Sequence, residues 1–273
     1  MLVNRPNITE KTFRKLTLRL RSDGFSYAID DTLTDSVLSF GEIMLADEGL
    51  PKDLSRSYET AFQNEENLNQ NFDKVVVLHE NGLNTFVPKA LFDEQYLGSY
   101  LQYNVKVFES DAVAFDELPT YEMNNVYLPF SGIEAFLGEK FGNVESRHLG
   151  SVLVSRLLET SKNNDEKQVF AHFSDKRFDL VIVQNQKLLL FNSFDFRTKE
   201  DFIYYLLFAA EQLNLNPEFF RLQLLGDISG ESDCFRMAYK YVRNVELFDV
   251  SKLQSRNDFS EAENRKHFIL FQS

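Results

Sequence analysis

The sequence predicts an α/β protein that is built from two copies of one lobe. Between Gln168 and Phe248, short apolar runs and amphipathic stretches follow the order β-β-β-α-β-α-β, and the same order is expected between Leu16 and Phe108. The two series also end alike, with Asn104-Val105-Lys106-Val107-Phe108-Glu109 in one and Asn244-Val245-Glu246-Leu247-Phe248-Asp249 in the other. A repeated order of seven elements indicates an internal duplication.

The second half shows this order most clearly. Apolar runs at 169–173, 180–183 and 188–191 are separated by polar turns, which predicts an antiparallel meander of three strands. Thr198 is the expected N-cap of a helix whose apolar residues recur at three- and four-residue steps as far as Leu213. A strand at 220–225, a helix at 232–242 and a strand at 245–248 complete the series. Because the strand runs are continuous, we expect a sheet that is covered on both faces.

The first half is expected to repeat these elements. Strands are predicted at 16–20, 25–29 and 37–45, with Ser22-Asp23-Gly24 as the turn between the first two. A helix at 54–68, a strand at 75–78, a helix from Pro88 through Leu101 and a strand at 105–108 follow. Each half then reaches a last apolar stretch, at 126–130 and at 268–271.

The element order predicts three parts of the chain. We expect an N-terminal lobe at 1–131, connecting helices at 132–166 and a C-terminal lobe at 167–273. Apolar residues with helical spacing between Leu149 and Leu157 support the connecting helix. No Pro- or Gly-rich linker lies between the lobes, so we expect them to share an interface.

Composition narrows the class of function. The net charge of −13 opposes binding to nucleic acid or anionic lipid. One cysteine allows no internal disulfide and favours a reducing compartment. The first residues lack the apolar core of a signal peptide, and the longest apolar runs are too short for a membrane span. We therefore expect a cytoplasmic protein whose partner is another protein, with an oligomeric state that the sequence leaves open.

A duplicated β-β-β-α-β-α-β unit joined by helices resembles the actin-like ATPase superfamily, whose halves each have a ribonuclease H-like fold. Similar bacterial members are FtsA and the pilus protein PilM, and an uncharacterised bacterial family of actin-like fold is more similar still. The resemblance covers nearly the whole chain and rests on the order of the elements. It implies two lobes, each with a mixed β-sheet flanked by helices. At this length we expect no insertion large enough for the extra subdomains of actin and the chaperone ATPases.

The resemblance also implies where a nucleotide would bind. The family places phosphate-binding turns after the first strand of each half, because backbone N–H groups of a tight turn bind phosphate while an aspartate holds magnesium and its water. In this sequence the first turn contains Asp23, Gly24 and Ser26, and the position of the family's aspartate falls on Leu20 or Arg21.

The other two parts of the implied site match less well. The second turn contains Asp175 but no glycine, and Phe173 and Phe178 are bulky where phosphate must approach the backbone. The adenosine side of the site has a partial match in Gly226, Asp227 and Gly230. The pattern is therefore a degenerate form of the family's motif.

Two functions follow from this comparison. In the first, which we favour, the protein is a non-catalytic scaffold or regulator that needs no cofactor. In the second, it is a nucleotide-binding ATPase or a sugar-kinase-like enzyme that uses ATP and magnesium in the cleft between the lobes. The sequence indicates no catalytic residue and no metal site.

Three other readings are disfavoured. A ribonuclease H-type nuclease needs carboxylates on its first strand, and the runs 16–20 and 169–173 contain none. Cys234 is expected to fill space in a core. The four histidines lack the spacing of zinc ligands and are expected at strand ends or on the surface.

Overall fold

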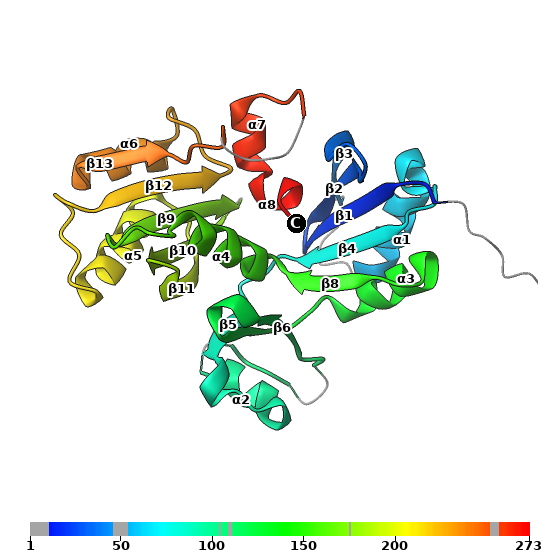
Figure 1. Cartoon of the computed structure of the whole chain (residues 1–273), viewed down its shortest axis with the longest axis horizontal. Helices are drawn as coiled ribbons and strands as arrows, with labels where there is room; N and C mark the ends of the chain where they lie inside the picture. The colour runs from blue at the N-terminus through cyan, green and yellow to red at the C-terminus, as the bar shows by residue number, and fades with distance from the viewer. Residues whose placement is uncertain (1–10, 46–53, 104, 109–110, 175, 252–256) are drawn as a thin grey trace, which may run out of the picture.

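The chain folds into two lobes that lie side by side, with a smaller knob below their junction (Figure 1). Figure 1 is a computed structural model, and the structure describes residues 11–45, 54–103, 105–108, 111–174, 176–251 and 257–273. Each lobe is built on a five-stranded sheet, with the order β3-β2-β1-β4-β8 in one and β11-β10-β9-β12-β13 in the other. The two orders are equivalent, which confirms the predicted duplicated fold.

The first lobe begins with the predicted antiparallel meander. It comprises β1 (Arg14–Arg21), β2 (Gly24–Asp31) and β3 (Ser36–Met44). Strands β4 (Lys74–His79) and β8 (Glu145–His148) extend the sheet parallel to β1. Helices α1 (Leu54–Asn64) and α3 (Ser131–Phe141) pack against each other, and their apolar residues share a core with β1, β2 and β4. A 3₁₀ turn, η1 (Glu66–Leu68), follows α1.

The second lobe has the predicted elements in the predicted order. Its meander is β9 (Gln168–Ser174), β10 (Arg177–Gln184) and β11 (Lys187–Asp195). Helix α5 (Lys199–Gln212) begins at a capping box between Thr198 and Asp201, as expected from the sequence. Strand β12 (Arg221–Gly226), helix α6 (Asp233–Tyr241) and strand β13 (Asn244–Leu247) follow, and α5 and α6 share a core with the sheet.

Helices from both ends of the second lobe join it to the first. Helix α4 (Leu149–Thr160) leads from β8 into β9, and α7 (Glu261–Lys266) and α8 (Phe268–Phe271) return the end of the chain to the first lobe. Helix α8 contacts β1 and β2. One apolar core, which includes Leu78, Leu153, Phe170 and Phe268, unites strands of both sheets with these helices. The lobes therefore share an interface, as predicted, and the part of it formed by α4, α8 and the strands that they contact is apolar.

The knob is an insertion in the first lobe, which we call the insert (residues 83–128). It contains a second sheet of order β5-β7-β6, formed by β5 (Asn84–Pro88), β6 (Ala114–Leu118) and β7 (Met123–Tyr127). Helix α2 (Leu97–Leu101) packs on this sheet, and 3₁₀ turns η2 (Lys89–Leu91), η3 (Glu94–Tyr96) and η4 (Pro119–Tyr121) connect the parts. Leu128 N–H donates to Leu83 O at 3.0 Å and closes the neck. We expected no insertion large enough for the extra subdomains of actin and the chaperone ATPases, but the insert is a small subdomain with its own sheet and core.

The structure also corrects two local predictions within the insert. Residues 105–108 form no strand, and the helix expected from Pro88 is replaced by two 3₁₀ turns and the short α2. The stretch at 126–130 contributes to β7 of the insert, whereas the stretch at 268–271 is a helix. The strand equivalent to β13 is β8, which the sequence did not predict. Among the described residues, none of the helices has both the length and the hydropathy needed to cross a bilayer.

Candidate functional site at the junction of the lobes

The carboxyl ends of the parallel strands in the two sheets point toward each other (Figure 1). In open α/β sheets, ligands bind beyond the carboxyl ends of the strands, so this junction is the first place to look for a site. On β1, Leu16, Leu18 and Leu20 pack in the core of the first lobe. Because side chains alternate along a strand, Arg19 points the other way, toward the second lobe.

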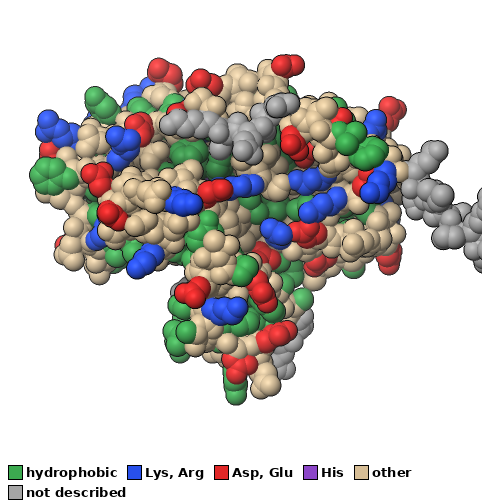
Figure 2. Space-filling model, viewed as in Figure 1, with side chains coloured by type: hydrophobic (Ala, Val, Ile, Leu, Met, Phe, Trp, Pro, Cys, Tyr) green, Lys and Arg blue, Asp and Glu red, His purple; other side chains and the backbone are tan. Residues whose placement is uncertain are grey.

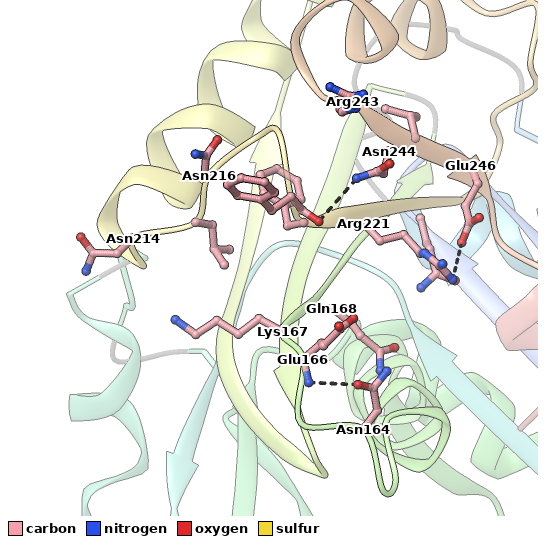
Figure 3. A pocket seen from close by; sticks show the side chains of 15 residues that line it. Asn164, Glu166, Lys167, Gln168, Asn214, Asn216, Arg221, Arg243, Asn244 and Glu246 are labelled. Atoms are coloured by element: carbon pink, nitrogen blue, oxygen red, sulfur yellow. Dashed lines mark hydrogen bonds and ion pairs between the residues drawn. The ribbon is translucent and has the colours of Figure 1, made fainter.

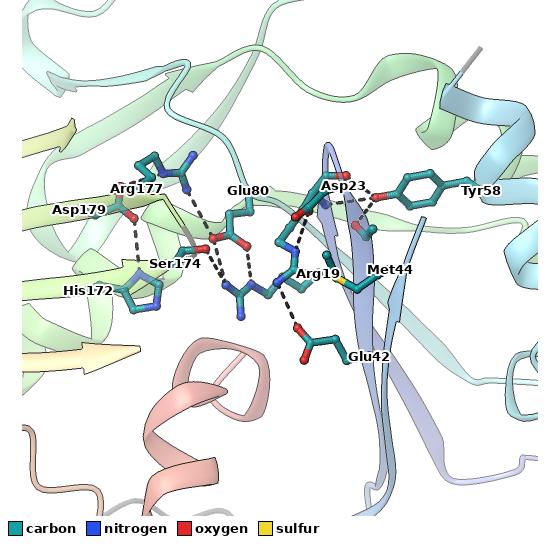
Figure 4. Close-up of polar contacts among 12 residues, drawn as sticks. Arg19, Asp23, Glu42, Met44, Tyr58, Glu80, His172, Ser174, Arg177 and Asp179 are labelled. Carbon is teal, nitrogen blue, oxygen red and sulfur yellow. Dashed lines mark hydrogen bonds and ion pairs between the residues drawn. The ribbon is translucent and has the colours of Figure 1, made fainter. Parts of the chain in front are cut away.

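A buried group of charged side chains joins the two lobes here (Figure 4). Arg19 and Glu80 form an ion pair, in which Arg19 Nη2 donates to Glu80 Oε1 at 3.0 Å, and their side chains are 5% and 2% exposed. Arg19 Nη2 also lies 3.2 Å from Ser174 Oγ at the end of β9. Arg177, the first residue of β10, approaches Glu80 Oε1 to 3.5 Å. One carboxylate of the first lobe is therefore shared by arginines from both lobes.

The group extends into the second lobe through Asp179. Its carboxylate lies 3.6 Å from Arg177 Nε and 3.5 Å from His172 Nδ1, and it accepts a 2.6 Å hydrogen bond from Ser193 Oγ. We call Arg19, Glu80, Ser174, Arg177 and Asp179 the junction cluster. Two arginines face two carboxylates in this cluster, so its formal charge is zero.

The electrostatics of the junction cluster keep both acids ionised. Burial alone would raise the pKa of Glu80, but the charge and hydrogen bonds of Arg19, with Arg177 adding, hold that pKa far below its usual value. Burial likewise opposes ionisation of Asp179, and Arg177 and His172 outweigh it, so the pKa of Asp179 is lowered. The ionised carboxylates of Glu80 and Asp179 therefore neutralise the charges of Arg19 and Arg177.

A second series of ion pairs lies along the edge of the junction. Arg21 Nη1 donates to Glu42 Oε1 at 3.1 Å, and Arg21 Nε lies 3.1 Å from Asp23 Oδ1 (Figure 4). From α7, Lys266 Nζ reaches Glu42 Oε2 at 3.3 Å. Both cations of this series, Arg21 and Lys266, therefore have an acid partner.

Of the three residues predicted in the first turn, Asp23 and Gly24 have structural roles. Asp23 forms the ion pair with Arg21. At Gly24, an added Cβ would lie 2.2 Å from Ile43 O, so glycine is required by the close approach of β3. Ser26 is fully buried on β2, where its hydroxyl makes no hydrogen bond within the described residues.

Two of the predicted residues of the second lobe, Gly226 and Asp227, lie beside β9. Gly226 has a φ of +84°, and a Cβ there would lie 2.1 Å from Phe173 O. The Asp227 N–H donates to the same carbonyl at 2.9 Å. Gly230 faces open space, and Asp175 lies outside the described residues. Gly226 thus permits close packing of the ends of β9 and β12, which is an explanation for this glycine that needs no nucleotide.

Large pockets lie elsewhere on the molecule. A groove of about 980 Å³ runs along the amino ends of β9, β12 and β13, at the opposite end of the second sheet from the junction (Figure 3). One ion pair lies within the groove, with Arg221 3.5 Å from Glu246. Two further pockets, of about 720 and 460 Å³, adjoin the insert. Neither they nor the groove is lined by any predicted site residue that the structure describes.

The cysteine and the histidines do not form a metal site or a reactive thiol site within the described residues. Among the described residues, no group of three His, Cys, Asp or Glu side chains could hold a metal ion. Burial raises the pKa of Cys234 to about 11, so its thiol stays protonated. His79 and His148 end strands as expected, but the expectation of surface histidines is wrong, because all four histidines are at most 4% exposed.

The sequence missed the members of the junction cluster. Arg19 lies within the apolar run 16–20, and Glu80 directly follows the strand 75–78. The charge of Arg19 inside this predicted strand was the one feature of the sequence that could have indicated the cluster. Its partners could not be named, because Arg19 and Ser174 are 155 positions apart.

Two mixed sheets of equivalent order, joined at their carboxyl ends through a polar junction, define a protein of actin-like ATPase fold. The chain belongs to the family described as "Protein of unknown function (DUF3822)", whose model matches residues 4–245. A protein of Bacteroides thetaiotaomicron VPI-5482 with an actin-like ATPase fold and unknown function is similar, with a TM-score of 0.78 and 23% identity over 89% of this chain and 94% of that one.

A second solved structure, the PilM-PilN type IV pilus biogenesis complex, gives a TM-score of 0.58 and 12% identity over 94% of this chain and 96% of the other. Both likenesses are below 25% identity and therefore concern the fold alone. No curated protein matched the sequence.

Proposed function

We propose that the chain is a protein-binding member of the actin-like ATPase fold that acts as a scaffold or regulator and neither binds nor hydrolyses a nucleotide. The observation that supports the proposal is the buried pair of Arg19 and Glu80, which is shared with Ser174 and Arg177 across the junction. Phosphate binding needs N–H donors and positive charge that face the ligand. In this chain the donors of Arg19 face a carboxylate and a hydroxyl of the chain itself.

The energetics of the pair favour the same conclusion. A nucleotide that entered the junction would have to separate Arg19 from Glu80 or accept Glu80 as a negative neighbour. Leaving one member of a buried ion pair without its partner costs about 3–5 kcal/mol. Since every 1.4 kcal/mol is about tenfold in affinity, this cost would weaken nucleotide binding by roughly a hundredfold to several thousandfold.

The partner that we propose is another protein. PilM, one of the neighbours in fold, is known from a complex with PilN. The net charge of −13 disfavours nucleic acid as a partner of this chain. The exposed apolar side chains of the insert, such as Leu91 and Tyr103, are of the kind that protein interfaces cover.

A thermal-shift titration with ATP and magnesium tests the proposal. We expect no change in the free energy of unfolding at millimolar nucleotide. A ligand present at 100 times its Kd would stabilise the protein by about 2.7 kcal/mol, which is readily measured.

Stabilisation by ATP would contradict the proposal and favour the nucleotide-dependent alternative. That alternative further requires that Asp23→Asn or Asp227→Asn removes the shift, while Asp93→Asn on the insert leaves it unchanged. A shift that survives both substitutions would place the nucleotide away from the lobe junction.

A further inference from the structure

For its length, the insert exposes more large apolar side chains than the rest of the protein. Among the described residues, 14 large hydrophobic side chains are exposed, and five of them belong to this segment of 46 residues. Leu91, Tyr96 and Tyr103 are 71%, 58% and 90% exposed. Single exposed apolar residues are ordinary on protein surfaces, but such a concentration on one small subdomain indicates a surface that binds another molecule.

The exposed residues are not needed for the core of the insert. That core is formed by Val87, Leu101, Val126 and Leu128, with Phe92, Tyr100 and other half-buried residues packed around them. The Phe92 and Tyr100 rings stack with centroids 6.0 Å apart, and Tyr100 also donates to Leu91 O at 2.8 Å. The backbone around Leu91 is thus fixed from inside while the Leu91 side chain points outward.

Negative charge surrounds these apolar side chains. The sequence of the insert contains seven acids and two lysines, a net charge of −5, whereas the other 227 residues together carry −8. Figure 2 shows hydrophobic and acidic side chains interspersed over the knob. Asp93, Glu94, Glu117 and Glu122 are exposed, and Asp93 caps the turn that carries Tyr96. The surface is therefore apolar and acidic at once.

We propose that the insert is a docking surface for a segment of a partner protein that is both basic and apolar. Charge complementarity favours a basic partner, because its Lys or Arg residues would face Asp93 and Glu94. The apolar side chains of the partner would cover Leu91, Tyr96 and Tyr103. A second copy of this chain is a poor occupant, because both copies would carry −13. The inference rests on the proposed function and names the partner's chemistry.

Synthetic peptides added to the full chain test the docking surface. The probe is a fluorescent amphipathic peptide of about 14 residues made of Lys and Leu at helical spacing. Comparison peptides replace Leu by Gln or Lys by Glu. We expect the Lys/Leu peptide alone to bind, with an affinity that falls at least about tenfold between about 0.05 and 0.3 M salt. Hydrogen exchange should show protection in residues 89–103.

Paired variants separate this surface from general attraction to an acidic protein. Leu91→Ser with Tyr103→Ser should weaken binding about tenfold or more. The matched control, Tyr204→Ser with Phe208→Ser, removes two exposed and stacked aromatic side chains of α5 and should leave the affinity unchanged. Both variants should keep the urea midpoint of the parent chain, because all four side chains are more than half exposed.

Several outcomes would overturn the inference: equal weakening by both variants, protection outside the insert, equal binding of the Gln-containing peptide, or no binding of the Lys/Leu peptide. Self-association that the Leu91 and Tyr103 substitutions abolish would assign the surface to a second copy. The nucleotide titration is independent of these measurements. A positive ATP result with peptide binding intact would remove the proposed function and leave the docking surface.

Discussion

Gly226 of β12 lies so close to Phe173 of β9 that a Cβ at Gly226 would be 2.1 Å from Phe173 O and 2.8 Å from Phe173 N. Both contacts are with backbone atoms of a neighbouring strand, which cannot rotate away as a side chain can. Gly226 also has a φ of +84°, a conformation that side chains with a Cβ rarely adopt. The end of β12 is therefore a position where only glycine fits.

We expect Gly226→Ala to lower the free energy of unfolding by at least about 2 kcal/mol, because backbone strain and a steric clash act together. Gly230→Ala is the matched control, since a Cβ at Gly230 meets no atom within 4 Å and no positive φ is required there. That change should stay within about 0.5 kcal/mol of the parent chain. Urea unfolding checks both values, and equal stability of the two variants would contradict the packing explanation.

For the junction cluster, we expect Glu80→Gln to cost about 3–5 kcal/mol, because Arg19 would stay buried without its partner. Arg19→Met combined with Glu80→Leu should cost less than the sum of the single changes, since neither charge is then left alone. A double-mutant cycle measures the difference. Arg243→Ala serves as the control: its pair with Glu218 is 72% and 62% exposed and should contribute no more than about 1 kcal/mol. Additive single changes at Arg19 and Glu80 would rule out a coupled pair.

Stability should fall as the pH decreases from about 6.5 toward 4. Burial lowers the pKa of His79 and His267 to about 4, and burial together with the charge of Arg177 lowers that of His148 to about 3. Below the unfolded pKa of about 6.5, the unfolded chain binds protons that the folded chain does not, so each histidine destabilises the fold by up to about 1.4 kcal/mol per pH unit.

Two half-buried acids act in the opposite direction and make the net slope smaller. Burial raises the pKa of Asp30 and of Asp116 to about 6, so between pH 6 and 4 these groups favour the folded state as the pH falls. Urea unfolding at several pH values gives the slope, and His148→Gln should reduce it. A free energy of unfolding that is constant from pH 6.5 to 4.5 would contradict the assignment of neutral, buried histidines.

The hydroxyl of Tyr58 on α1 supports the turn between β1 and β2. It accepts from Arg21 N–H at 3.2 Å and lies 2.5 Å from Gly24 O. Burial raises the pKa of Tyr58, so the hydroxyl stays protonated and able to donate. Tyr58→Phe should cost about 1–3 kcal/mol, because buried backbone groups lose their partner. Thermal denaturation measures this, and faster hydrogen exchange at residues 21–24 should accompany it; Phe62→Leu, which keeps the turn contacts, should not change exchange there.

The sequence predicted the second lobe well because apolar runs, polar turns and caps agree there. The first lobe was harder for a specific reason: β8 reads Glu145-Ser146-Arg147-His148 and contains no apolar side chain. Its strand conformation comes from pairing with β4, which no local pattern reveals. Residues 105–108 show the reverse case, since Val105 and Val107 alternate as in a strand but instead pack against the core of the insert.

The candidate site was only partly visible in the sequence. Asp23, Gly24 and Gly226 lie at or beside strand ends, as the sequence indicated, and their part in a nucleotide site stays a prediction. Their required conformations come from neighbouring strands rather than from a ligand. The junction cluster depends on contacts between distant segments, such as Glu80 with Arg177, and ion pairs of this kind have no signature in a single sequence.

The short neck of the insert has a consequence for changes in its sequence. Because the chain departs at Leu83 and rejoins at Leu128, two residues joined by a backbone hydrogen bond, the sheet of the lobe keeps its strand order whatever lies between them. Substitutions or changes of length between these two residues should therefore have little effect on folding of the lobe. The proposed docking surface can change in this way without altering the sheet that carries the junction cluster.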